Sequence, residues 1–600
     1  MKTISNPNWR AAFRITVLAA YFHAFMEWLF FVTKPSSLSI LTIFEKVDVL
    51  FITGGVVSAL LLAGFAIFFL ISHLRPKWDF LLYIPAAFIL SVTALILFDN
   101  FTYTVFKFGI VSTDGVVRAL YTLGFIVAIW WMSRFARRTN IANRKYASFL
   151  TLGLLAVSTI GILTTYFSSN PNTSSDTSSQ KADLPNIIIL GGDGLSANYM
   201  SAYGYSLETT PFLEKLTKTS LVAENAFPNA SGTTASTTSL LTGKEPITVK
   251  VLRYPDILSG NDSFEHLPGI LKREGYQTVE IGTPYYVDAQ KLNLLDGFDM
   301  VNNRSADLPA LDALRTILGN SPSLYFIQTI TERASERLLH IFFVREMQNP
   351  LEEVNSPKSR MNDDERTQQI IQALDQAKQP VFIFSHFMDT HGPEFSSSYH
   401  VFYSGSSDEA KEWDKDLYKD ALLSFDSHVQ NIYDYLVKSG KLNNTILLIY
   451  TDHGFGYSTS QRIPIIFHFP NDGYAGARVS NVQILDIPVT LLDYLDIPAP
   501  AWMVGTSMLG EEPPLDREII SIRTGSPSKE KPPFYQIKSV QVTVCERWFD
   551  LNVQENSWKS GLVGRHTYKC EPDILPTAEQ VRQRILDYLQ EHSYDISSLQ

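Results

Sequence analysis

Hydrophobic and polar positions divide the chain into two parts. Residues 1 to 167 contain five long apolar runs, whereas the rest alternates apolar and polar segments like an ordinary soluble protein. Each run is long enough, or nearly so, to cross a bilayer as a helix. The runs are Ile15–Thr33, Val49–Ser72, Phe80–Phe98, Val116–Met132 and Ala147–Phe167. We therefore predict a five-helix transmembrane domain over residues 1 to 167, followed by separate domains.

Basic residues around these runs indicate an orientation. They gather before the first run, between the second and third, and between the fourth and fifth, as Lys2, Arg10, Arg14, Arg75, Lys77, Arg134, Arg137, Arg138, Arg144 and Lys145. Basic loops stay on the cytoplasmic side. We expect a multi-pass protein of the cell membrane with a cytoplasmic N-terminus. An odd number of spans places everything after Phe167 outside the cytoplasm.

Two ionisable residues lie inside the first run. His23 and Glu27 are four positions apart and share one helical face. Ionisable groups within a membrane are costly and often functional. The alternative, which we favour, is that an interface or a neighbouring helix satisfies them structurally.

The pattern after the fifth run predicts three further parts. Residues 168 to 183 are small, polar and without a period, which is typical of a flexible linker. Residues 184 to 513 alternate strand-like and helix-like runs, which predicts an α/β domain with a mostly parallel sheet. Its predicted strands are Asn186–Leu190, Thr278–Ile281, Val381–Phe384 and Thr445–Tyr450, with a further apolar run at Ile463–Phe467. Residues 514 to 600 predict a small α+β subdomain of short strands and a helix at Ala578–Glu591.

Residues 303 to 376 predict a helical insertion in the α/β domain. Within it, Leu324–Phe343 is amphipathic and rich in large apolar side chains. Such a helix either rests on a membrane surface or packs on its own domain. We favour packing on its own domain, because that is the commoner arrangement.

Composition narrows the function. The formal charge is −11, and no basic stripe lies outside the membrane flanks, so we expect no nucleic-acid partner. The two cysteines, Cys545 and Cys570, lie near the C-terminus and lack the spacing of a zinc finger. They could pair in an oxidising compartment, although the sequence does not establish the bond.

Polar residues follow three of the predicted strands. Asp193 ends the first, His391 follows the third, and Asp452 with His453 ends the fourth. The hydroxyl-rich part of the stretch Asn229–Gly243 leads into an apolar helix that ends at Gly243. Carboxylate and imidazole groups are suitable ligands for a divalent metal ion, which would activate a hydroxyl nearby. The sequence therefore predicts one metal-assisted site at this edge of the sheet.

The motifs together resemble the sulfatase/alkaline-phosphatase superfamily. The matching stretches are Pro185–Asp193, Tyr203–Leu216, Leu240–Gly243, Asp426, Gly440, Asn444, Thr451–Gly454, Arg462–Ile466, Asp486 and Leu491–Asp493. Aligning the family's nucleophile motif on Gly243 places the nucleophile at Thr233. The cysteine or serine, the proline and the arginine of sulfatases are absent there, so the chain is more similar to membrane phosphoethanolamine and phosphoglycerol transferases of the lipoteichoic-acid-synthase type.

This resemblance implies a site and a cofactor. It implies Asp193, Thr233, Asp452 and His453 as ligands of one divalent ion, with His391 near the substrate. Zinc, manganese, calcium and magnesium all stay open. The chain departs from the family at Gly194, where a second acidic residue is usual, and in the short loop at residues 455 to 461.

Three functions stay open at this point. The first is a membrane-anchored transferase that moves a phosphodiester-linked head group from a membrane-lipid donor to an envelope glycan or lipid through Thr233. The second is a membrane-tethered hydrolase of phosphate or sulfate esters. The third, suggested by the short loop, is a catalytically weakened relative that binds an anionic ligand.

Overall fold

In the computed structural model the chain forms two compact units. The helical unit comprises residues 1–176 and 307–349, and the α/β unit comprises residues 177–306 and 350–600. The structure describes residues 9–33, 38, 41–106, 110, 115–138, 145–169, 184–254, 256–283, 286–302, 304–305, 314, 317–318, 321–343, 362–405, 410–525, 534 and 536–600. Most of the predicted linker, residues 170 to 183, lies outside them, while residues 168 and 169 end a helix.

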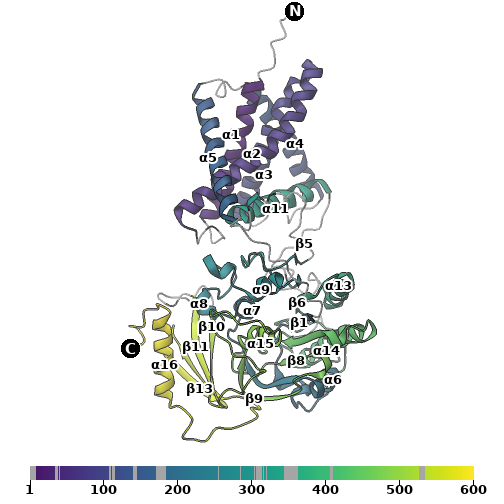
Figure 1. Ribbon diagram of the computed structural model, residues 1–600, viewed down its shortest axis with the longest axis vertical. Coiled ribbons are helices and arrows are strands. Elements are labelled where there is room, and N and C mark those ends of the chain that lie inside the picture. Colours follow the sequence, from purple (N-terminus) through teal and green to yellow (C-terminus); the bar gives the residue numbers. More distant parts are fainter. Residues whose placement is uncertain are drawn as a thin grey trace, which may run out of the picture. The chain divides into compact units, whose positions relative to one another are not determined.

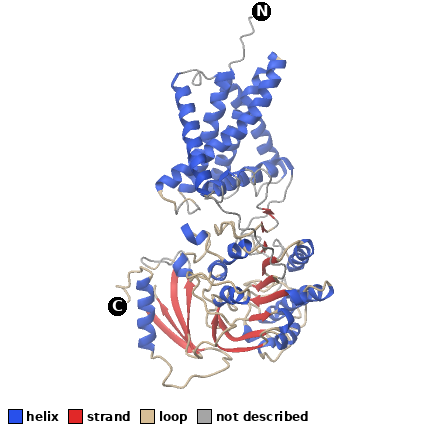
Figure 2. Ribbon diagram, in the orientation of Figure 1, coloured by secondary structure: helices blue, strands red, loops and turns tan. Residues whose placement is uncertain are grey.

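The helical unit is built from the predicted apolar segments. They form α1 (Trp9–Val32), α2 (Ile43–Leu74), α3 (Ile84–Phe106), α4 (Gly115–Arg138) and α5 (Lys145–Ser169), with a 3₁₀ segment at Pro76–Tyr83 before α3. Figures 1 and 2 show these helices side by side as a bundle. Within the described residues, five helices are long and apolar enough to cross a membrane.

The inserted helix α11 (Pro322–Phe343) belongs to this helical unit. We expected it to pack on the α/β domain, and that expectation is wrong. Its apolar residues Phe326 and Ile330 join Val49 of α2 in one buried cluster. Figure 1 shows α11 lying across the bundle. An amphipathic pattern predicts that one face is buried, but it does not say against which partner.

Charged residues fix α11 to the bundle. The Arg333 guanidinium donates to the Glu27 carboxylate of α1 at 2.9 Å, and Arg337 donates to Asp99 of α3 at 2.7 Å. The His23 imidazole hydrogen-bonds the Thr93 hydroxyl of α3 at 2.9 Å. His23 and Glu27 therefore both have partners on neighbouring helices, as the structural interpretation requires.

A large mixed sheet organises the α/β unit. Its strand order is β5-β4-β3-β6-β1-β7-β8-β2-β9 in the described residues. The strands are β1 (Asn186–Gly192), β2 (Leu221–Phe227), β3 (Gln277–Ile281), β4 (Met300–Val301), β5 (Arg304–Ser305), β6 (Val381–Phe387), β7 (Thr445–Tyr450), β8 (Ile465–His468) and β9 (Gly476–Gln483). The central strand β1 pairs in parallel with both β6 and β7. Their carboxyl ends therefore meet at one edge, as predicted.

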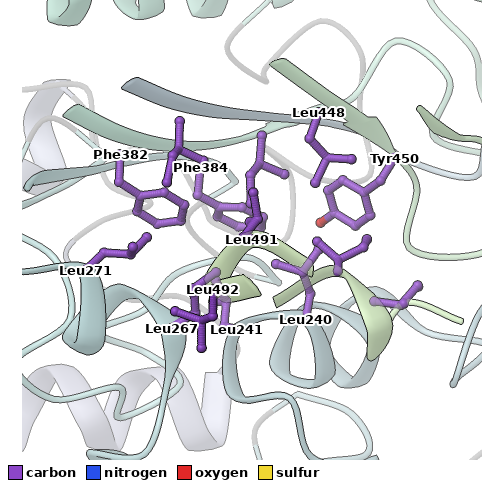
Figure 3. Close-up of a cluster of buried hydrophobic side chains, with 14 of the residues drawn as sticks. Leu240, Leu241, Leu267, Leu271, Phe382, Phe384, Leu448, Tyr450, Leu491 and Leu492 are labelled. Atoms are coloured by element: carbon purple, nitrogen blue, oxygen red, sulfur yellow. The ribbon is translucent and has the colours of Figure 1, made fainter. Parts of the chain in front are cut away.

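Helices cover both faces of this sheet, so its central strands are apolar on both sides. Along β1, Ile187 and Ile189 join the cluster under α7 (Thr233–Thr242), α9 (Leu267–Arg273) and α15 (Asp486–Tyr494). Figure 3 shows leucines of these three helices packed on Phe382 and Phe384 of β6. Ile188 and Leu190 face α6 (Pro211–Leu216), α13 (Asp363–Gln376) and α14 (Lys415–Lys438). This core holds the three site strands rigidly.

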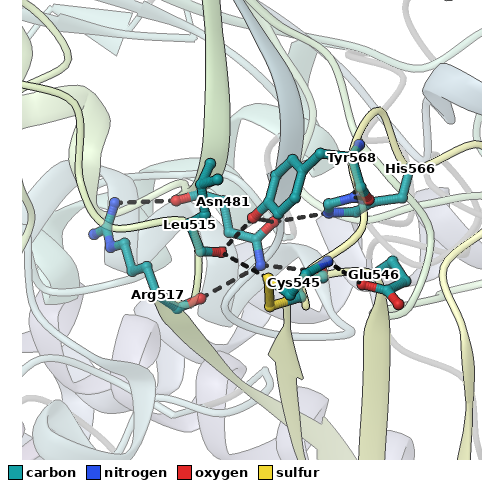
Figure 4. The surroundings of a disulfide bond; sticks show 8 residues. Asn481, Leu515, Arg517, Cys545, Glu546, His566 and Tyr568 are labelled. Atoms are coloured by element: carbon teal, nitrogen blue, oxygen red, sulfur yellow. Dashed lines mark hydrogen bonds between the residues drawn. A yellow bond between two sulfur atoms is a disulfide. The ribbon is translucent and has the colours of Figure 1, made fainter. Parts of the chain in front are cut away.

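The C-terminal residues form a four-stranded antiparallel sheet and a helix. The elements are β10 (Glu518–Thr524), β11 (Ile537–Val544), β12 (Arg547–Asn552), β13 (Ser557–Leu562) and α16 (Ala578–Glu591), the last with the predicted bounds. Cys545 and Cys570 form a disulfide, whose surroundings Figure 4 shows. The Asn481 amide of β9 donates to the Cys545 carbonyl at 3.3 Å, which ties this subdomain to the large sheet.

Candidate active site

The carboxyl ends of β1 and β7 bring three predicted ligands together. Asp193, Asp452 and His453 are all buried, and one ligand atom of each lies within 4.8 Å of the others. Asp193 follows β1 directly, and its N–H donates to the Phe387 carbonyl of β6 at 3.0 Å. Because the chain is hydrogen-bonded to the neighbouring strand up to this residue, the carboxylate has a fixed position.

Each carboxylate uses one oxygen as an anchor. Asp452 accepts hydrogen bonds at Oδ1 from the N–H groups of Gly194, at 3.1 Å, and His453, at 3.0 Å. Asp193 accepts at Oδ2 from the Thr233 hydroxyl at 3.2 Å. The second oxygens, Asp193 Oδ1 and Asp452 Oδ2, are buried and have no hydrogen-bond partner.

The His453 ring completes this set. Its Nδ1 lies 3.1 Å from the Gly454 carbonyl, which can only accept, so Nδ1 carries the proton. Nε2 then has a free lone pair, and it too is buried without a hydrogen-bond partner. Buried polar atoms are nearly always paired. Two carboxylate oxygens and one imidazole nitrogen left over at one point therefore fit a divalent cation, and zinc, manganese, calcium and magnesium stay open.

Thr233 lies beside this cluster at the first position of α7. Gly232 precedes it in an extended conformation and offers no side chain to cap the helix. The first N–H groups of α7 therefore have no side-chain acceptor from the cap residue, and the helix dipole adds a positive field at this end of the helix. This arrangement favours an oxyanion on Thr233 or a bound phosphate or sulfate group.

Two further histidines shape the electrostatics. His386 of β6 is fully buried, and its Nε2 lies 3.2 Å from Asp193 Oδ2. Burial alone would raise the pKa of Asp193, but His391, His386 and His453 outweigh it and hold that pKa well below its usual range. Burial also lowers the pKa of His386, but the bond to Asp193 and the Asp452 charge outweigh it and raise that pKa. Asp193 is therefore ionised at neutral pH.

A pocket of about 340 Å³ opens over Thr233. It is lined by Ser231, Gly232, Thr233, Thr234, Leu252, Arg253, Tyr254, Tyr286, His391, Tyr457 and Thr524. His391, which we expect near the substrate, is one of these lining residues. Thr524 comes from β10, so the C-terminal sheet supplies part of the wall.

Several pocket residues escaped the sequence analysis. Arg253, Tyr254 and Tyr286 lie in segments without a recognisable motif, so no signal marked them. Tyr457 belongs to the short loop at residues 455 to 461, where the chain departs from the family. Its hydroxyl donates to the Gly392 carbonyl at 3.3 Å and its ring lies 4.8 Å from that of His453. The loop therefore does contribute to the pocket.

Comparison with known proteins identifies the family of this chain. The sulfatase family model matches residues 185–497, more than half of the chain. The chain belongs to the sulfatase family. The match confirms the family resemblance that the motifs predicted.

Individual relatives of the sulfatase family are distant. Human iduronate 2-sulfatase is 24% identical over 220 residues, which are 36% of each chain. N-acetylglucosamine-6-O-sulfatase of Bacteroides thetaiotaomicron is 29% identical over 114 residues, 17% of this chain and 20% of that one. The matches thus span about a third or less of these relatives. The structure of a phosphonate monoester hydrolase from Agrobacterium radiobacter superposes with a TM-score of 0.47 at 14% identity, covering 68% of this chain and 96% of that chain.

Proposed function

We propose that the protein is a membrane-anchored, metal-dependent transferase that moves a phosphodiester-linked head group from a membrane lipid to an envelope glycan or lipid. The observation that carries this proposal is the Thr233 hydroxyl, held 3.2 Å from Asp193 at a helix start beneath an open pocket. The five apolar helices support it, because they would keep the site close to a lipid donor.

The reaction would proceed in two steps, the formation and the breakdown of a phospho-threonine. Thr233 Oγ1 gives up its proton and attacks the phosphorus of the donor, the bond from phosphorus to the lipid oxygen breaks, and that oxygen takes up a proton. A hydroxyl of the acceptor then loses its proton and attacks the phosphorus of the phospho-threonine, the bond from phosphorus to Thr233 Oγ1 breaks, and Oγ1 takes up a proton. A divalent ion bound at Asp193, Asp452 and His453 would lower the pKa of the hydroxyl and neutralise charge on the phosphoryl oxygens.

The residues of this chain have separate parts in these steps. Asp193 orients the Thr233 hydroxyl by accepting its hydrogen bond. The start of α7 stabilises negative charge at the phosphoryl oxygens. We assign to His391, which lines the pocket, the protonation of the leaving lipid oxygen.

A test uses the full chain in vesicles with a phospholipid labelled in its head group. We expect Thr233→Ala to lower head-group transfer by about 10³-fold or more, because the covalent step has no nucleophile. Thr217→Ala serves as the control, since that hydroxyl only donates to the Glu214 carbonyl on the surface. Unchanged transfer in Thr233→Ala would falsify the proposal.

A hydrolase of phosphate or sulfate esters is the second candidate. The match to the sulfatase family model favours it, as do relatives named as sulfatases. The two candidates differ in their acceptor. Release of free phosphorylated head group or sulfate, at a rate that added acceptor does not reduce, would identify the hydrolase.

A further inference from the structure

A groove runs between α3 and α4 in the helical unit. Its volume is about 430 Å³. Apolar side chains form its walls, among them Leu95 and Phe98 of α3 and Leu120 and Phe125 of α4. Small residues give it depth. Gly124 lies in the groove, and a Cβ atom added there would meet no atom within 4 Å.

The groove has the length of half a bilayer. Its lining extends along α4 from Val117 to Ala128. Eleven helical steps of about 1.5 Å span roughly 16 Å, about half of a hydrocarbon core that is roughly 30 Å thick. One end lies near Asp99, which follows Phe98 and pairs with Arg337 of α11. The groove therefore lies at the depth of one leaflet, the leaflet on the side of Asp99.

The walls of the groove are fixed by packing. The centroid of the Phe125 ring lies 6.2 Å from that of Phe88 of α3 and 5.8 Å from that of Phe342 of α11. The Thr122 hydroxyl of α4 donates to the Ile341 carbonyl of α11 at 2.7 Å. Because these contacts with α3 and α11 hold α4 in position, the groove wall is ordered by the protein itself, which reduces the entropic cost of binding.

We propose that this groove binds one acyl chain of a membrane glycerophospholipid. Only 6% of the apolar stretch of α4 is buried within the protein, so the groove is open to the surrounding lipid. Its apolar walls favour an alkyl chain over a polar ligand. Polar groups meet the ester and phosphate region at its outer end. The Tyr121 hydroxyl lies 3.5 Å from the Thr102 hydroxyl. Asp99, which pairs with Arg337, directly follows the groove residue Phe98 in the chain. This inference does not depend on the reaction at Thr233.

The experiment uses the full chain in vesicles of phosphatidylethanolamine and phosphatidylglycerol, with a trace of phosphatidylglycerol that carries a photoreactive group in one acyl chain. Labelled peptides are mapped by mass spectrometry. We expect labelling to concentrate in α3 and α4. Gly124→Leu, which fills the groove, should lower labelling there several-fold.

Gly153→Leu is the matched control. Gly153 lies on α5, and a Cβ atom added there also meets no atom within 4 Å, so both variants should fold. Labelling of α3 and α4 should be unchanged in this control. Equal labelling of α3 and α4 in the two variants would mean bulk lipid only and would overturn the proposal. A Leu120→Cys variant that forms disulfide-linked dimers in the membrane would also overturn it, because a second copy would then cover the groove.

Discussion

Asp452 uses its two oxygens differently. Oδ1 accepts two backbone N–H groups, whereas Oδ2 is buried without a hydrogen-bond partner. Asp452→Asn keeps the shape but removes the charge that a divalent ion needs. We expect the metal content of the purified protein, measured by elemental mass spectrometry, to fall at least about tenfold, in line with the loss of a ligand interaction. Asp496→Asn is the control, because Asp496 is exposed and has a positive φ that Asn also adopts. Equal metal content in the two variants would rule out the proposed site.

Asp426 gives stability a predictable pH dependence. It accepts hydrogen bonds from the N–H groups of Phe212 and Leu213, both at 2.8 Å. Burial raises its pKa from 3.8 to about 6, although these bonds and Lys215 oppose the rise. Between about pH 4 and 6 the folded chain therefore keeps a proton on Asp426 that the unfolded chain releases. The contribution of this proton to the free energy of unfolding is full below about pH 4 and is lost as the pH rises through about 6.

The test compares the wild type with Asp426→Asn, which does not titrate. The free energy of unfolding of the wild type relative to the variant should fall by up to about 3 kcal/mol between pH 4 and pH 7. Denaturation of the purified full chain in detergent measures this difference. A difference that is constant with pH would show that burial does not raise the pKa of Asp426.

Residue types and strand ends were enough to predict Asp193, Asp452 and His453 at one edge of the sheet. The family resemblance added Thr233, which the structure brings to Asp193. From the sequence we singled out His391 and assigned no role to His386, although both follow the same apolar run. Only the register of β6 beside β1 shows that His386 points at Asp193. Arg253 needed the fold as well, since it reaches the pocket from a loop.

At the scale of elements, periodicity predicted those strands that are apolar throughout. β1, β6 and β7 were found because both of their faces are buried. We did not predict β2 and β9. Glu224 and Asn225 interrupt the apolar pattern of β2, and β9 begins with exposed residues near the edge of the sheet. Pairing with neighbours, rather than their own composition, makes them strands.

The attachment of α11 to the bundle rests on a buried ion pair. Glu27 is 3% exposed and Arg333 is 16% exposed. Arg333→Ala leaves the Glu27 carboxylate buried without its partner, so we expect a loss of about 3–5 kcal/mol in the free energy of unfolding. Glu27→Gln in the same chain should recover part of this loss, because the unpaired charge disappears.

The control is the pair Arg137 and Asp79, whose side chains are 51% and 24% exposed. Exposed ion pairs contribute about 0–1 kcal/mol, so Arg137→Ala should change stability little. Denaturant unfolding of the full chain in detergent micelles compares the variants. Similar losses for Arg333→Ala and Arg137→Ala would contradict a special role of the α11 contact.

At the scale of the molecule, the chain passes between its two units more than once. The chain leaves the helical unit after α5, enters it again for α11 and leaves it before α13. The sequence predicted one linker between a membrane domain and a following domain. It did not predict the return of α11, because the ion pairs that hold it join residues about 240 to 300 positions apart, such as Arg337 with Asp99 and Arg333 with Glu27.

The orientation predicted from the basic loops can be tested with single thiols. Both cysteines are used in the disulfide, which also fits an oxidising compartment outside the cytoplasm. An introduced cysteine is therefore the one free thiol of the chain. In intact cells, a membrane-impermeant maleimide should label Ser174→Cys, which follows the fifth helix. It should label Arg138→Cys, at the basic C-terminal end of α4, only after the membrane is opened, because basic segments stay inside. The reverse pattern would place the N-terminus outside and the catalytic unit in the cytoplasm, where the Cys545 to Cys570 bond would be reduced.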